Sequence, residues 1–439
     1  MPVYSPPLED IRFVLHEVLG ASSLAELPGY EEVSIDLIDQ ILEEGGKVCE
    51  EVFFPLNQAG DDGCTFKDGE VTVPKGFKEG YDTFIEGGWT GLACDAKYGG
   101  MGMPQLINTA MKEMICSSNM SLGMYPGLSY GAYEALHKFA TEELKDIYLP
   151  KLTEGTWSGT MCLTESHCGT DLGLIKSKAM PNDDGSVNIT GTKIFISAGE
   201  HDMSDNIIHL VLARVEGAPD GVKGISLFIV PKHNVDADGK ILDQNAVSCG
   251  SIEEKMGIHG NSTCVMNYDG AVGEMIGEEN KGLRVMFVMM NEARLGVGMQ
   301  GLGQSEAAYQ NAVEYARDRL QGRSLTGPKN EDGPADPLMV HPDVRRMLMD
   351  MRAFNEAGRA FLYWLALQED LERYSPDEKV RERADDFLGL MTPVIKGYLT
   401  DVGFANCVNA QQIYGGHGFI EEWGMSQFVR DARIAMIYE

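Results

Sequence analysis

Residues 158–280 differ from the sequence on both sides in the period of their hydrophobic pattern. Stretches such as "GSVNITGTKIFISAG", "NIIHLVLARV" and "GISLFIVP" are rich in β-branched residues and are separated by Asp, Gly and Asn. This composition is typical of strands bounded by turns. The flanking sequence instead repeats apolar residues every three to four positions, which indicates helices. We therefore expect an α+β protein with a helical domain, a middle β domain and a second helical domain.

The N-terminal helical domain is expected to span residues 1–157. Its clearest helical stretch is "YEEVSIDLIDQILEEGGKVCEEVFFPLNQAG", where Gly45-Gly46 interrupts the apolar pattern. The residues expected to share one face of this helix are Val33, Leu37, Ile41, Val48 and Val52. Glycine-rich turns then separate further predicted helices, "GFKEGYDTFIEGG" and "LINTAMKEMICSSNMSLGMY".

The C-terminal domain is expected to span residues 281–439 and to form a helical bundle. It contains three long stretches with apolar stripes, which begin "GLRVMFVMM", "VHPDVRRML" and "FLGLMTPVI". A Pro/Gly-rich connection, "TGPKNEDGPADPLMVHP", joins the first two of them. Long striped helices with short connections favour a bundle.

Charge and cysteine spacing exclude several classes of protein. The net charge of -31 leaves no basic stripe to neutralise a nucleic-acid backbone. The nine cysteines form no CxxC and no cluster with zinc spacing, so we expect no metal site. No apolar run is long enough to cross a membrane, and the N-terminus lacks the features of a signal peptide. We expect a cytoplasmic protein with free thiols.

The strongest local motif is "MCLTESHCGTDLG", residues 161–173, at the entry to the β domain. Its Thr164, Gly169 and Thr170 could bring hydroxyls and backbone N–H groups against a flat polar ligand, because glycine permits close approach. A polar loop with a Ser/Thr/Asp cap would explain the same residues.

A second motif, "KIFISAG", places an aromatic side chain beside a hydroxyl. Phe195 and Ser197 are two residues apart, so on a strand they face the same side. Such a pair suits a ring with hydrogen-bonding edges, although ordinary sheet packing would also account for it.

Two further segments stand out near the C-terminus. Arg317, Arg319 and Arg323 cluster in "EYARDRLQGRS", where the alternative is a solvated helix end. In "QQIYGGHGF", the alternative is that Gly415-Gly416 only terminates a helix. The given sequence ends on Glu439, directly after the mostly apolar stretch "RIAMIY". If these neighbours bury the Glu439 carboxyl, they raise its pKa and tune it as a base. The alternative is that Glu439 belongs to a frayed end.

Together, in this order and spacing, the four segments resemble the acyl-CoA dehydrogenase flavoprotein family. "CLTESHCGTD" is similar to its first signature, T-E-x-x-x-G-[ST]-D, and "QIYGGHGFIEEWGMSQFVRDARI" to its second. The resemblance runs from roughly residue 40 to the end. Ser166, Cys168 and Gln427 depart from the usual residues, at positions without a catalytic role.

This resemblance implies an FAD held between the β domain, the C-terminal domain and a neighbouring subunit. The residues implied to lie at the flavin are Met161, Leu163, Thr164, Gly169, Thr170, Phe195 and Ser197. Those implied to reach the FAD of a neighbour are Arg319, Gln321, Gln412, Gly415 and Gly416. Arg suits this role because its fork matches phosphate oxygens. The resemblance therefore implies a homodimer or a dimer of dimers.

The catalytic base implied by the resemblance is Glu439, in the context "IYE". Some members carry the base one residue before a conserved Arg, but Ala293 precedes Arg294 here, and Glu292 is expected to point off that face. The substrate residues implied are Thr170, Asn291, Arg294 and Tyr438. Because the family continues beyond this Glu, the C-terminal domain is expected to be truncated.

The reaction implied is FAD-dependent α,β-dehydrogenation of a short acyl-CoA, with an electron-transferring flavoprotein as acceptor. The segment "ELPGYEEVSIDLIDQILEEGG" and the sequence after it resemble the long subfamily that includes 3-methylmercaptopropionyl-CoA dehydrogenases of dimethylsulfoniopropionate breakdown. Two alternatives stay open at this point, an acyl-CoA oxidase and a non-catalytic flavin-binding scaffold.

Overall fold

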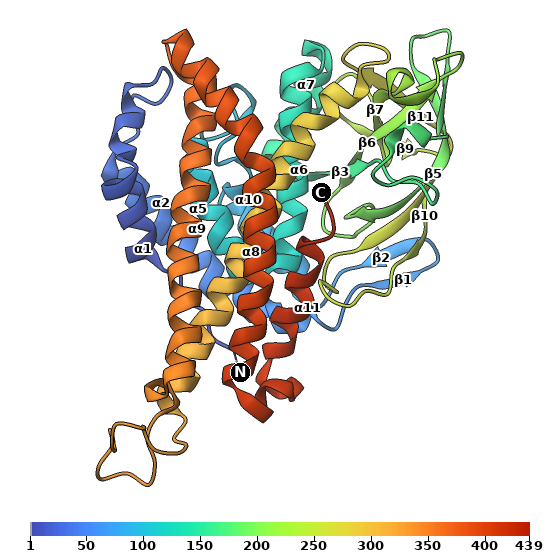
Figure 1. Cartoon of the computed structure of the whole chain (residues 1–439). Helices are drawn as coiled ribbons and strands as arrows, with labels where there is room; N and C mark the ends of the chain where they lie inside the picture. Colours follow the sequence, from blue (N-terminus) through green and yellow to red (C-terminus); the bar gives the residue numbers. More distant parts are fainter. Residues whose placement is uncertain (1) are drawn as a thin grey trace.

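The N-terminal part of the protein is mainly helical. The computed structural model describes residues 2–439 (Figure 1). The helices of this part are α1 (Leu8–Arg12), α2 (Ile35–Lys47), α3 (Phe54–Gly60), α4 (Phe77–Glu86), α5 (Gln105–Ser118), α6 (Met120–Phe139) and α7 (Glu142–Glu154). Asn119 separates α5 from α6, and its side chain caps α6 by accepting a hydrogen bond from the Leu122 N–H.

The helix that begins as α2 runs through Gly45-Gly46, contrary to the predicted interruption. A π-helical segment, Val48–Phe53, joins it to α3 without a break. A Cβ on Gly45 would lie 2.5 Å from Met111 Sδ, so glycine at this position lets α2 approach α5 closely. The core-facing stripe is wider than predicted: Val33 is buried and Ile41, Val48 and Val52 pack against the core, but Ile38 and Leu42 are buried as well.

A short hairpin interrupts the N-terminal helices, which the sequence analysis did not anticipate. It consists of β1 (Thr65–Lys67) and β2 (Glu70–Thr72), with Phe66 paired to Val71. Val71 is buried in the core of the β domain, so the hairpin packs there instead of among the helices.

A seven-stranded sheet forms the middle of the chain. Its strands are β3 (Trp157–Cys162), β4 (Lys178–Pro181), β5 (Val187–Ser197), β6 (Asn206–Val215), β7 (Ser226–Pro231), β10 (Val247–Ile252) and β11 (Thr263–Ile276). The long β11 pairs with β10 and β5 and, at its end, with β7, whereas β3 runs parallel to β6. A separate pair, β8 (His233–Val235) and β9 (Ile241–Gln244), completes the domain.

The C-terminal part contains three long helices and a shorter one. These are α8 (Gly282–Asp318), α9 (Pro342–Tyr374), α10 (Glu378–Ile413) and α11 (Met425–Ala435). Figure 1 shows α8 and α9 beside α5, α10 packs on α8 and α9, and residues of both helical parts share one hydrophobic core. The carboxyl end of the chain, after α11, lies between α6 and the sheet (Figure 1).

The observed order of helices, β-rich middle and helices confirms the predicted fold class. Within residues 2–439, no helix has the length and apolar character needed to cross a membrane.

Candidate active site

One large cavity lies where the sheet meets the two helical parts. Its volume is about 970 Å³, and its walls come from α5, α6, β3, β5, α8 and the residues after α11. All seven residues predicted at the flavin line it: Met161, Leu163, Thr164, Gly169, Thr170, Phe195 and Ser197. Arg294, Tyr438 and Glu439 line the same cavity.

A buried ion pair holds the loop of the first signature in place. The Nζ of Lys193, on β5, donates to the carbonyl of Leu163 and to Glu165 Oε1, both at 2.9 Å. Glu165 also accepts hydrogen bonds from the backbone N–H groups of Lys176 and Ser177. Burial alone would raise the pKa of Glu165, but Lys193 and these hydrogen bonds lower it to about 2. Glu165 is therefore a charged anchor for the loop.

Glu165, His167 and Cys168 are the one group of potential metal ligands found in residues 2–439. Their ligand atoms lie within 4.8 Å of one another. The Glu165 carboxylate is already engaged by Lys193, however, and His167 Nε2 faces the carbonyl oxygen of Leu174 at 2.9 Å. The arrangement is accounted for by loop packing.

Phe195 presents an aromatic face to the cavity. The side chain is 60% exposed, and the backbone has a φ of 58°. A bulge in the pairing of β5 with β11, between Cys264 and Met266, accompanies this change of direction. Ile196 and Ser197 line the cavity as well, so the alternation expected of a regular strand does not hold at this bulge.

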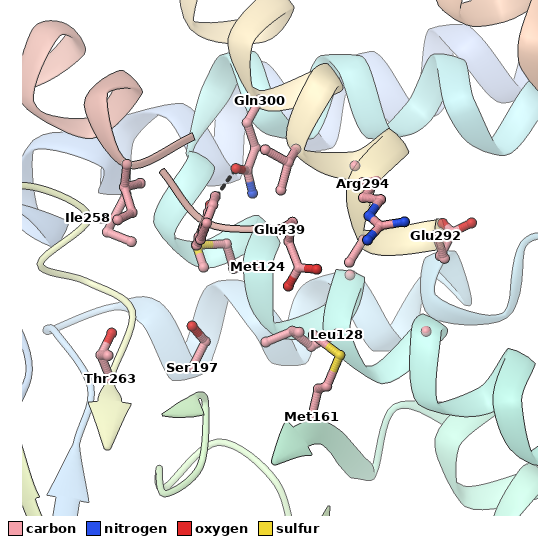
Figure 2. Close-up of a pocket in the computed structure, with 18 of the residues that line it drawn as sticks. Met124, Leu128, Met161, Ser197, Ile258, Thr263, Glu292, Arg294, Gln300 and Glu439 are labelled. Atoms are coloured by element: carbon pink, nitrogen blue, oxygen red, sulfur yellow. Dashed lines mark hydrogen bonds between the residues drawn. The ribbon is translucent and has the colours of Figure 1, made fainter. Parts of the chain in front are cut away.

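Glu439 lies in the cavity. A turn of three residues after α11 and a hydrogen bond from Tyr438 position it there. The Ile437 and Tyr438 N–H groups both donate to the carbonyl of Ile434, which closes a turn after α11. The Tyr438 hydroxyl donates to Gln300 Oε1 on α8 at 2.5 Å. Figure 2 shows Glu439 between Leu128 and Arg294, with Met161 on the side of the sheet.

The electrostatics of Glu439 suit a group that exchanges protons near neutral pH. The surrounding protein desolvates its carboxyl and raises its pKa to about 7, even though Arg294 and Lys396 act in the opposite direction. The cavity leaves the side chain accessible. A general base works best when its pKa lies near the working pH.

Residues 291–293 of α8 differ in whether they line the cavity and in their partners. Ala293 and Glu292 both line the cavity. The Glu292 carboxylate forms an ion pair with Lys112 on α5. Asn291 is not among the lining residues, but its Oδ1 accepts a hydrogen bond from Arg294 at 3.2 Å.

The five residues predicted to reach a neighbour's FAD lie outside this cavity. All five are exposed: Arg319, Gln321, Gln412, Gly415 and Gly416. Arg319 follows the end of α8, and Gly415 follows α10 with a φ of 59°.

The residues of the cavity fit an isoalloxazine ring. Phe195 offers an uncovered aromatic face and Met161 an apolar contact, while Thr164 and Ser197 offer hydroxyls. Such a combination suits a planar group that is apolar on its faces and polar at its edges.

Comparison with known proteins agrees with this geometry. Profiles of the acyl-CoA dehydrogenase N-terminal, middle and C-terminal domains match residues 65–156, 160–271 and 280–439. The chain belongs to the acyl-CoA dehydrogenase family. Members of this family depend on a flavin.

Several acyl-CoA dehydrogenases are similar over almost the whole chain. The 3-methylmercaptopropionyl-CoA dehydrogenase of Ruegeria pomeroyi is 44% identical over 437 residues, which are 99% of this chain and 74% of the relative. A butyryl-CoA dehydrogenase of Syntrophomonas wolfei is 38% identical over 450 residues, covering 99% of this chain and 73% of the relative. Among solved structures, butyryl-CoA dehydrogenase from Megasphaera elsdenii superposes with a TM-score of 0.74 at 26% identity, over 92% of this chain and 94% of that one.

Three lysines that act on residues of the site were not identified from the sequence. Lys193 and Lys112 are distant from their partners along the chain, and Lys396 lies on the third long helix. A lysine within an apolar stretch, as in "GTKIFIS", is the one available signal, because a buried lysine needs a partner.

Proposed function

We propose that this acyl-CoA dehydrogenase oxidises short acyl-CoA thioesters, with Glu439 as its base and FAD as its flavin. The observation that carries the proposal is the position and pKa of Glu439. Its carboxyl opens into the cavity and has a pKa near 7, whereas Glu292 is paired with Lys112 and position 293 is an alanine.

In this reaction Glu439 removes the α-proton of the thioester as the α,β double bond forms. FAD, when bound, accepts the β-hydrogen as hydride. The thioester α-proton is a weak acid, so the carbonyl needs polarising, and we assign part of this to the backbone N–H of Glu439. Met124, Leu128 and Met161 line the cavity with apolar surface.

The flavin would be held by the residues that line the cavity on the side of the sheet. We assign this role to Met161, Leu163, Thr164, Gly169, Thr170, Phe195 and Ser197. Thr170, Asn291, Arg294 and Tyr438 are assigned to the substrate. The exposure of Arg319, Gln321, Gln412, Gly415 and Gly416 supports their assignment to the FAD of a second subunit, in a homodimer or a dimer of dimers.

The first substrate to test is 3-methylmercaptopropionyl-CoA, because the relative that is 44% identical carries that name. We propose an electron-transferring flavoprotein as acceptor and a cytoplasmic location, which nine free cysteines suit.

Anaerobic mixing with 3-methylmercaptopropionyl-CoA, butyryl-CoA and palmitoyl-CoA tests the proposal through flavin absorbance. Reduction by the two short thioesters supports it. Reduction by palmitoyl-CoA alone would refute the substrate class, and rapid release of hydrogen peroxide in air would favour an oxidase.

A further inference from the structure

One residue of the cavity wall has an unusual backbone conformation. Ile258 lies in the loop between β10 and β11, lines the cavity and is buried, and its φ is 47°. A β-branched residue rarely adopts this left-handed region, because its Cβ crowds the backbone. Such a conformation persists only where the surrounding structure holds it, and it is common at functional sites. Specific contacts must therefore keep Ile258 in place.

The side chain of Asp431, on α11, provides one of these contacts. Its Oδ1 accepts a hydrogen bond from the Ile258 N–H at 2.5 Å, and the residue is 2% exposed. Burial raises the pKa of Asp431 to about 6, so the group is mainly a carboxylate at neutral pH. A hydrogen bond to a carboxylate is stronger than one between neutral groups. Asp431 therefore offers a buried, charged acceptor to the strained residue.

The backbone of α11 also lies directly against this loop. A Cβ placed on Gly257 would be 2.5 Å from the carbonyl oxygen of Arg430, so glycine at this position permits the close approach. The Arg430 guanidinium pairs with Asp61, which follows α3, and Asp61 Oδ1 also lies 2.9 Å from His259 Nδ1 in the loop. These contacts fix the loop on α11 beside Asp431.

The Ile258 side chain contacts the segment that carries Glu439. Ile258 is buried together with Met124 of α6, and Ile434 and Tyr438 pack against this cluster. The carbonyl of Ile434 accepts the N–H of Tyr438, which precedes Glu439. Figure 2 shows Ile258 and Met124 on the same side of Glu439. If Ile258 moved, the turn before Glu439 would lose this apolar support.

A hydrogen bond from Tyr438 fixes the same segment from another direction. Its hydroxyl donates to Gln300 Oε1 on α8, while its side chain packs against the cluster that contains Ile258. Tyr438 is therefore held between α8 and the loop of the β domain. Such support matters for catalysis, because a misplacement of about 1 Å can cost about 10²-fold in rate.

We propose that Asp431 is a positioning residue for the base Glu439. By holding Ile258 in its left-handed conformation, Asp431 keeps the Ile258 side chain against Ile434 and Tyr438, and so fixes the turn that directs Glu439 into the cavity. Asp431 is not among the residues that line the cavity, so it acts through Ile258 and not on the substrate. This inference rests on the proposed function, because that function makes Glu439 the base.

The test compares Asp431→Leu with Asp431→Asn. Leucine cannot accept the Ile258 N–H, whereas asparagine keeps an oxygen acceptor. In anaerobic stopped-flow mixing with saturating butyryl-CoA, Asp431→Leu should reduce its flavin about 10²-fold more slowly than the parent protein, with little change in the Kd of the thioester. Asp431→Asn should stay close to the parent rate.

A double-mutant cycle tests whether Asp431 acts through Ile258. Ile258→Gly removes the side chain but lets the backbone keep its positive φ without strain. Each single change should slow flavin reduction. The double variant Asp431→Leu, Ile258→Gly should be no slower than the slower single variant, because both changes remove the same support. If the two effects instead multiply, Asp431 does not act through Ile258 and the inference is overturned.

The matched control is Asp370→Leu. Asp370 is also fully buried, and its carboxylate accepts the backbone N–H groups of Gln105 and Leu106 at 2.8 and 3.0 Å. It is not among the residues of the cavity. The same substitution should lower the urea midpoint of unfolding and leave the rate of flavin reduction near that of the parent.

Amide hydrogen exchange gives a readout that does not depend on the reaction. Asp431→Leu should speed exchange in peptides that cover residues 253–262 and 432–439, whereas Asp431→Asn and Asp370→Leu should not. If no acyl-CoA reduces the flavin of the parent protein, the proposed function fails, and unchanged exchange in Asp431→Leu would separately refute the contact.

The remaining outcomes decide the role of Asp431. A parent-like rate in Asp431→Leu overturns the inference, and so does an Asp431→Asn variant that is as slow as Asp431→Leu. If Asp431→Leu fails to fold, Ile258→Gly decides: slow flavin reduction with an unchanged Kd supports the inference, and the parent rate refutes it.

Discussion

Replacing Glu439 by glutamine should nearly abolish flavin reduction and leave the protein otherwise intact. The change keeps the size and polarity of the side chain but removes its ability to accept a proton. A general base contributes about 10²–10⁴-fold, so the first-order rate of flavin reduction should fall by at least about 10²-fold. Binding of FAD and of the thioester should stay near the parent values, because Glu439→Gln alters no apolar contact of the cavity.

The pH dependence of the parent protein adds a second readout. With a pKa of about 7, the active form of Glu439 is the deprotonated one. The reduction rate should therefore rise with pH, reach a plateau above about pH 8 and fall about tenfold per unit well below pH 6. Stopped-flow absorbance of the flavin under anaerobic conditions measures both effects.

A matched control exists in the same cavity. Glu254 also lines it, so Glu254→Gln makes the same chemical change at a position without an assigned role. We expect close to the parent rate. If Glu439→Gln reduces the flavin as fast as Glu254→Gln does, the assignment of the base is refuted, and Glu292 becomes the next carboxylate to examine.

Three further predictions concern Lys396, Lys193 and Gly301. Lys396→Met removes a positive charge that lowers the pKa of Glu439, so the pH midpoint of flavin reduction should move upward, and an unchanged midpoint would contradict this effect of Lys396. Lys193→Met leaves a carboxylate buried without its cation, which should cost about 3–5 kcal/mol in urea unfolding and weaken flavin retention. Gly301→Ala would place a Cβ 2.4 Å from a carbonyl oxygen of α10 and should cost about 1–3 kcal/mol, whereas Gly296→Ala on the same helix should not destabilise the fold. Equal melting temperatures for these last two variants would count against the packing of α8 on α10.

The fold class could be predicted from local pattern because each domain has a distinct hydrophobic period. The predictions of detail that were wrong concern contacts between segments distant in the sequence. The continuation of α2 through Gly45-Gly46 was missed because Gly45 is needed where α2 meets Met111 of α5, a contact that the local sequence does not show. The β1–β2 hairpin was missed because its Val71 is buried by the β domain and not by neighbouring residues in sequence.

The candidate site also contains residues that the sequence predicted and residues that it did not. Motifs carried by continuous sequence, such as residues 161–173, brought their predicted residues to the cavity. The partner of Glu292 was not predicted, since spacing along α8 could not reveal a lysine on α5 that pairs with its carboxylate. No local pattern predicted the Lys193–Glu165 pair, because its residues are 28 positions apart.

The most direct test of the central claim is titration of the purified, flavin-loaded protein with 3-methylmercaptopropionyl-CoA in the absence of oxygen. We predict loss of flavin absorbance with a stoichiometric yield of the α,β-unsaturated thioester, at a rate that rises with pH through about 7. A flavin that stays oxidised with this and every other short acyl-CoA would contradict the account.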